Sequence, residues 1–67
     1  MSDCPKMKDA VYVCPGVWEH PRAAVHRVSQ RPVRWHVTTD PHNVFHATMY
    51  DAMAKLNGLP HEVIVQN

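Results

Sequence analysis

The sequence contains only two glycines and no long hydrophobic run. A glycine-rich phosphate-binding loop cannot be built from two glycines, so this class of nucleotide site is excluded. The longest apolar stretches, residues 10–14 and 63–65, are far shorter than the roughly 18 residues that cross a membrane. Residues 1–10 are polar and charged, so we expect neither a secretory signal peptide nor a membrane partner.

Catalytic groups are also sparse. Ser29 is the only serine beyond the first nine residues, and the acidic residues are dispersed along the chain. Enzymes that hydrolyse substrates usually combine a nucleophile with a base, or two carboxylates with each other. A chain of 67 residues also has little material for a cleft that shields a reaction from water. We therefore expect a protein that is not an enzyme and has no cofactor.

The length allows one domain. A chain of this size buries only about 60% of the surface that its unfolded form exposes, so a metal, a disulfide or a partner chain would add stability. The apolar share of 45% and the charged share of 19% are those of a globular protein. Because the chain starts at Met1 without a tag, we expect a complete small gene product.

Two cysteines, Cys4 and Cys14, lie ten residues apart. Without a signal peptide the expected compartment is the cytoplasm, where thiols stay reduced. A disulfide between the two is the alternative, and its geometry decides whether it can form. Neither thiol has a base at a spacing typical of a nucleophile.

Residues 33–39 carry the clearest strand pattern. Val33, Trp35, Val37 and Thr39 alternate with polar residues, which predicts a half-buried strand with these four side chains on one face. A short turn precedes it, so the strand should pair antiparallel with the strand before it. The predicted strands are residues 10–14, 23–29, 33–39 and 61–66.

Two parts of the chain are harder to assign. Residues 1–9 are polar, and we expect a flexible N-terminal arm in front of a single domain at residues 10–67. Residues 17–22 stay unassigned because Pro21 is incompatible with a central strand.

One helix is predicted over residues 41–57. Asp40 suits the N-cap position, and Pro41 suits the first helical position, where the missing N–H is not needed. Gly58 suits the left-handed residue that follows a helix. Apolar residues recur at helical spacing and form a stripe that should face the sheet: Phe45, Met49, Ala52, Met53 and Leu56.

These elements predict an α+β fold with a small three- to four-stranded sheet, in the order β-β-β-α-β, and one helix packed on one face. The strand at 61–66 is expected to run parallel to the strand at 33–39 through a right-handed crossover. The helix would then cover Trp35, Val37, Val63 and Val65. Arg34, His36 and part of Arg27 would lie on the opposite, uncovered face, which with the exposed edges is a natural place for a partner.

Positive charge is unevenly distributed. All four arginines, Arg22, Arg27, Arg31 and Arg34, lie within thirteen residues, and no acidic residue lies between positions 20 and 39. Such a cluster could attract an acidic protein surface or phosphate. A solvated basic hairpin without a role is the alternative. For a protein partner, Trp18 or Tyr50 would serve as the anchor beside His36 and the arginines.

Nucleic acid is the second candidate partner, because the same arginines lie near Trp18, Trp35 and His36. Basic β-ribbons with aromatic residues can stack on bases or enter a groove. Trp35 is predicted to point inward, however, which removes the best stacking ring. Homodimerisation through an exposed edge strand is a further alternative.

The chain contains six histidines. His42 and His46 are four residues apart on the predicted helix, so both would lie on one face, where two imidazoles can share a metal. His36 or Asp40 could supply a third ligand. Two surface histidines without a role, or a set of histidines that senses pH, are the alternatives.

In its short length, its complete start and its sheet-plus-helix pattern, the chain resembles small phage-encoded host-takeover proteins. That class includes anti-CRISPR proteins and inhibitors of host RNA polymerase. The resemblance involves no sequence motif and transfers no residue. It implies a stoichiometric inhibitor that blocks a host complex by occupying its surface. The sequence thus predicts a non-enzymatic module that binds the acidic surface of a larger protein or nucleoprotein complex.

Overall fold

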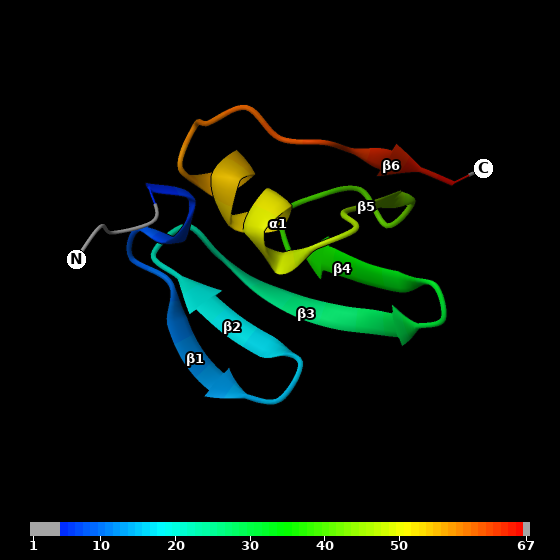
Figure 1. The fold of residues 1–67 in the computed structure, drawn as a ribbon, viewed down its shortest axis with the longest axis horizontal. Coiled ribbons are helices and arrows are strands. Elements are labelled where there is room, and N and C mark those ends of the chain that lie inside the picture. Colours follow the sequence, from blue (N-terminus) through cyan, green and yellow to red (C-terminus); the bar gives the residue numbers. More distant parts are fainter. Residues whose placement is uncertain (1–4, 67) are drawn as a thin grey trace.

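The computed structural model describes residues 5–66 and has an α+β fold, as predicted. Four strands form an antiparallel sheet in the order β1-β2-β3-β4, and one helix, α1, lies across one face of it (Figure 1). Two short strands, β5 and β6, form a second sheet. The strands of the main sheet are β1 (Val11–Cys14), β2 (Val17–His20), β3 (Ala23–Gln30) and β4 (Val33–Val37).

The predicted hairpin of β3 and β4 is confirmed, with Val25 opposite Val37 and Arg27 opposite Trp35. The unassigned segment contains β2, which ends at His20, so Pro21 follows the strand and interrupts no ladder. The turn between β1 and β2 places Gly16 at φ +84°, a backbone conformation that glycine adopts without strain.

The helix is shorter than predicted. α1 spans Met49–Leu56, and its N-cap is Thr48, whose Oγ1 accepts a hydrogen bond from the Asp51 amide at 3.1 Å. The predicted start at residue 41 is wrong because residues 41–48 form a turn and strand β5 (Val44–Phe45) instead. Asp40 therefore caps no helix, and Phe45 belongs to no helical stripe.

The last strand, β6 (Ile64–Val65), pairs antiparallel with β5, with Val44 opposite Val65. The predicted parallel pairing with β4 and the right-handed crossover are therefore wrong. The small sheet joins the main one where Trp35 and His46 exchange two backbone hydrogen bonds of 2.8 Å. Val63 and Val65 do not lie beneath the helix but are 47% and 58% exposed.

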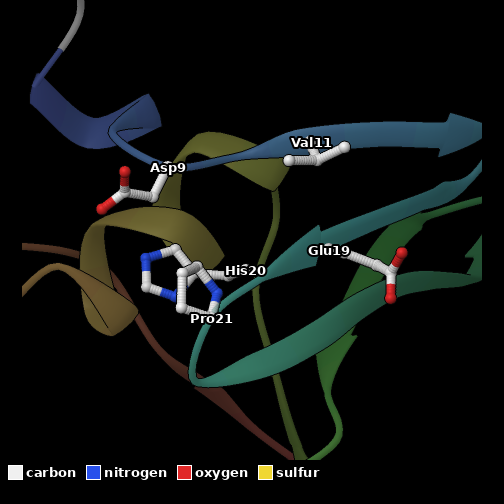
Figure 2. Close-up of a pocket in the computed structure, with 5 residues that line it drawn as sticks. All are labelled: Asp9, Val11, Glu19, His20 and Pro21. Atoms are coloured by element: carbon white, nitrogen blue, oxygen red, sulfur yellow. The ribbon is translucent and has the colours of Figure 1, made fainter.

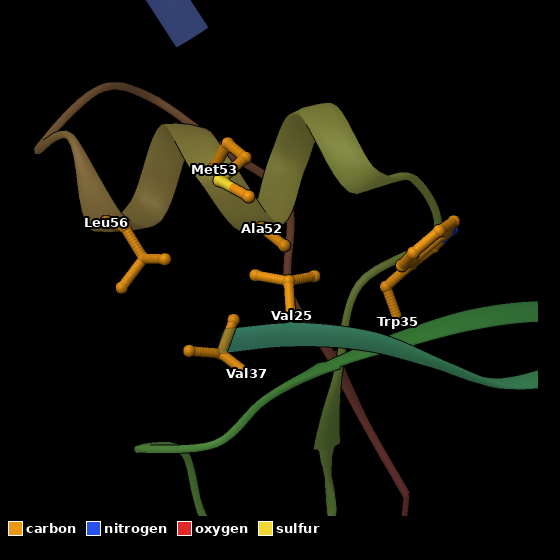
Figure 3. Close-up of a cluster of buried hydrophobic side chains, with 6 residues drawn as sticks. All are labelled: Val25, Trp35, Val37, Ala52, Met53 and Leu56. Carbon is orange, nitrogen blue, oxygen red and sulfur yellow. The ribbon is translucent and has the colours of Figure 1, made fainter. Parts of the chain in front are cut away.

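The core lies between α1 and the sheet. Val25, Trp35 and Val37 from β3 and β4 meet residues from the buried side of α1: Ala52, Met53 and Leu56 (Figure 3). The inward orientation of Trp35 and Val37 is thus confirmed, whereas Val33 and Thr39 at the ends of the predicted strand are exposed. In the part of the chain that the structure describes, no helix covers the opposite face of the sheet. Arg34 and His36 point to that face, because side chains alternate between the two faces along β4.

The N-terminal segment begins with a turn of 3-10 helix at Pro5–Met7. Met7 packs against the core, and the Asn57 amide Nδ2 donates to the carbonyls of Lys6 and Lys8 at 3.1 and 3.0 Å. Residues 1–4 of the predicted arm, including Cys4, lie outside the described residues. The predicted state of the two thiols therefore stays a prediction, with Cys14 exposed at the end of β1. Within residues 5–66, no helix is long and apolar enough to span a membrane.

Candidate functional site

The four arginines do not form one patch. Arg22 precedes β3 and Arg31 follows it, so their backbones are about 30 Å apart at about 3.3 Å per residue. Arg22 is tied to the helix, because its Nη1 donates to the Leu56 carbonyl at 3.2 Å. Its position at the end of α1 suits a cation, which compensates the partial negative charge there.

Arg31 and Arg34 lie at the turn between β3 and β4, and Arg27 lies further back on β3, where its guanidinium reaches Gly16 of the neighbouring turn; we call Arg27, Arg31 and Arg34 the basic tip. Arg31 lies in the turn itself. Arg27 lies on the face covered by α1, with its guanidinium carbon 5.8 Å from the centroid of the Trp35 ring. This corrects the expectation that part of Arg27 would lie on the uncovered face. Arg34 lies on that uncovered face, so positive charge is presented on both sides of the hairpin.

Apolar groups accompany these charges. Val28 and Val33, beside the turn, are 47% and 41% exposed. Next to them lies an open hollow of about 450 Å³, which we call the tip pocket. Its lining combines apolar and polar side chains, with Arg34 as the charged residue: Val28, Ser29, Pro32, Arg34, Phe45 and Gln66.

A second hollow, of about 500 Å³, lies beyond the same Phe45 and Gln66 and is also lined by His42 and Asn43. Since the two hollows share two residues, they form one interrupted groove beside β5. Among residues 5–66, no acidic side chain lines either hollow. The groove is therefore suited to an anionic rather than a cationic ligand.

His36 belongs to an aromatic row on the uncovered face. Its ring centroid lies 5.4 Å from that of His26 and 5.8 Å from that of Phe45. Its Nε2 is 3.2 Å from the Pro41 carbonyl oxygen, a contact that fixes the ring. His26 and Phe45 were missed by the sequence analysis, because their place beside His36 depends on the strand register and on β5.

The two predicted anchors lie away from the basic tip. Trp18 packs against the core and makes an edge-to-face contact with Tyr12, with ring centroids 5.3 Å apart. Tyr50 is 50% exposed but lies on α1, on the side of the sheet opposite Arg34. The structure thus brings His36 and Arg34 onto one face and does not bring either anchor to them.

The histidines predicted as metal ligands lie in different surroundings. His42 is exposed, whereas His46 is fully buried, because residues 41–48 are not the predicted helix. His46 Nδ1 lies 2.9 Å from the Glu62 carbonyl oxygen, and its Nε2 lies 3.2 Å from Asp40 Oδ2. Lys55 forms an ion pair with the other oxygen of Asp40. Among residues 5–66, no group of three His, Cys, Asp or Glu side chains is placed to hold a metal.

A third hollow, at the opposite end of β3, contains acidic side chains. A hollow of about 390 Å³ there is lined by two acidic residues, Asp9 and Glu19, together with Val11, His20 and Pro21 (Figure 2). Glu19 lies opposite Ala24, near the start of β3, whereas the basic tip lies beyond the end of that strand. The two carboxylates of this hollow therefore lie far from the basic tip, at the end of β3 that also carries Arg22.

No protein-family model, curated protein or solved structure matches this chain. The features that bear on its function are therefore its own charges, its exposed apolar side chains and its hollows. The basic tip and the groove beside it combine these three features in one place.

Proposed function

We propose that this protein is a non-enzymatic, cytoplasmic binding module that docks its basic tip and uncovered sheet face onto an acidic surface of a larger protein. The observation that carries the proposal is the composition of the tip. The exposed Val28 and Val33 are sequence neighbours of Arg27 and Arg34, Arg31 lies in the turn between them, and the chain has no acidic residue from position 20 to 39. Arginine and apolar contacts of this kind supply affinity at interfaces, and unbalanced charge speeds association with an oppositely charged partner.

The resemblance to small phage-encoded inhibitors suggests the mode of action. A module of this size would act stoichiometrically, by covering a surface that the larger complex needs. Binding rather than catalysis also agrees with the shape of the hollows, which are open and lie at the periphery of the sheet.

Nucleic acid is a less suitable partner for the same surface. Trp35 is only 9% exposed, and Arg27 lies over its ring, so this ring is unavailable to stack on a base. Phe45 lines the tip pocket beside Arg34, but it is half-buried, whereas a single-strand binder needs an exposed ring there. Nucleic acid therefore becomes one of the outcomes of the test.

The test is affinity capture from a bacterial lysate, run with and without nuclease, with the wild-type chain and two charge-reversed variants as baits. Arg27→Glu/Arg31→Glu reverses two charges of the basic tip and leaves the residues of the tip pocket intact. Lys6→Glu/Lys8→Glu makes the same change in net charge with two exposed side chains of the N-terminal segment. Circular dichroism establishes that both variants fold.

We expect the wild type and the lysine variant to retain one stoichiometric protein and the arginine variant to lose at least nine-tenths of it. If the partner is no longer recovered when nuclease is added, the basic tip binds nucleic acid rather than protein. Equal recovery by both variants would show that the basic tip is not the docking surface.

A further inference from the structure

Arg34 has a donor that is not satisfied. Its Nη1 donates to the Val33 carbonyl at 2.8 Å, but its Nε is buried and has no acceptor among the described residues. Buried donors without an acceptor are rare, since each has lost its hydrogen bond to water without replacing it. The arrangement destabilises the unliganded state and favours any ligand that brings an acceptor.

The tip pocket lies beside this guanidinium. Val28, Pro32 and Phe45 give it apolar walls, and Ser29 and Gln66 supply neutral polar groups. An apolar side chain can fill the pocket while an adjoining carboxylate meets Arg34. Rotation of the Arg34 side chain away from Val33 would let Nε and a terminal nitrogen bind both oxygens, which is the preferred geometry of an arginine–carboxylate pair.

We propose that the tip pocket recognises an acidic, extended segment of the partner protein in which a carboxylate adjoins an aliphatic or aromatic residue. This inference rests on the proposed function and specifies its partner. Charge complementarity supports a peptide segment of this kind, because no acidic side chain of the described part of the chain lines the pocket or its continuation past Phe45. The continuation accommodates further residues of the segment, beside His42 and Asn43.

The proposal is tested with the full chain, labelled with ¹⁵N, and a short blocked peptide in which a leucine lies between two glutamates. The Nε–H group of Arg34 gives its own NMR signal and reports directly on a new acceptor. We expect this signal and the amide signals of Val28 and Phe45 to shift as the peptide is added. A peptide with glutamines in place of glutamates, and one with glycine in place of leucine, should each bind at least fivefold more weakly.

Two conservative variants separate the pocket from general attraction to the basic tip. Arg34→Lys keeps the positive charge but removes Nε–H and the planar fork, so peptide affinity should fall about tenfold. Arg31→Lys is the matched control outside the pocket and should change affinity less than twofold. Both spectra should otherwise match the wild type, which establishes an intact fold.

The pocket proposal would be overturned if the Arg34 Nε–H signal does not shift. It would also be overturned if Arg34→Lys and Arg31→Lys weaken peptide binding equally. If Arg27→Glu/Arg31→Glu still fails to capture the partner protein in that case, the proposed function stands and only the pocket assignment is wrong. If a thymidine oligonucleotide shifts Arg34 as strongly as the peptide does, the pocket recognises phosphate rather than an acidic peptide.

Discussion

Replacing Asp40 by asparagine keeps the shape of a buried side chain and removes its charge. The Asp40 carboxylate is only 1% exposed, and its two oxygens face Nε2 of the fully buried His46 and the ammonium group of Lys55. Breaking a buried ion pair from one side costs about 3–5 kcal/mol, because the remaining charge has lost its partner without regaining water. The side chain of Lys55 is 33% exposed and can turn to solvent, so we expect the loss of unfolding free energy to lie at the lower end of this range, at about 3 kcal/mol.

That loss is large for this chain. At about 0.05–0.15 kcal/mol per residue, the total free energy of unfolding is roughly 3–10 kcal/mol. Asp40→Asn should therefore lower the melting temperature by on the order of 15 °C. Urea unfolding followed by circular dichroism measures the change, and Asp9→Asn is the control, because Asp9 is exposed and asparagine tolerates its positive φ of 63°. A loss below about 1 kcal/mol for Asp40→Asn would refute the view that this buried ion pair stabilises the fold.

Two further substitutions test the helix and its packing. Met53→Ala should lower the free energy of unfolding by about 3 kcal/mol, because the side chain is fully buried beneath α1 and leaves a cavity. Urea titration measures it, and a change under 1 kcal/mol would contradict tight packing there. Thr48→Ala should cost about 1 kcal/mol by removing the acceptor of the Asp51 amide, while Thr48→Ser should restore most of the loss. Equal stability of the serine and alanine variants in thermal melts would argue against this cap.

The helix boundary shows where local signals were insufficient. Asp40 followed by Pro41 is as good a start signal as Thr48, whose oxygen and the Asp51 amide actually form the cap. Tertiary contacts decide between the two start signals. Residues 44–46 form backbone hydrogen bonds with β6 and with Trp35, and a helix that began at residue 41 would lose these bonds. The composition Val-Phe-His is compatible with a short strand, but its partner at residues 64–65 lies beyond the range of local patterns.

The arginine cluster shows a second limit of sequence reasoning. Alternation in residues 33–37 correctly placed Trp35 inward and Arg34 outward, because side-chain direction follows from strand periodicity alone. The side on which Arg27 lies depends on its register opposite Trp35, which the sequence did not specify. Likewise, nearness in sequence placed Arg22 beside Arg31, although a strand of eight residues separates them. The tip pocket could not be predicted at all, since Phe45 and Gln66 reach it from the small sheet.

The order of the strands also has a consequence for how the molecule assembles and opens. Each strand of the main sheet pairs with its neighbours in sequence, so these hairpins can form through local contacts and should appear early in folding. The pairing of β5 with β6 encloses the whole of α1 between its two strands, so more chain entropy is lost before it forms. With two residues in each strand, it should also be among the first pairings to open in the native state. The side of the groove that β5 and β6 form would then open transiently, while the arginines of the basic tip stay in place on the hairpin of β3 and β4.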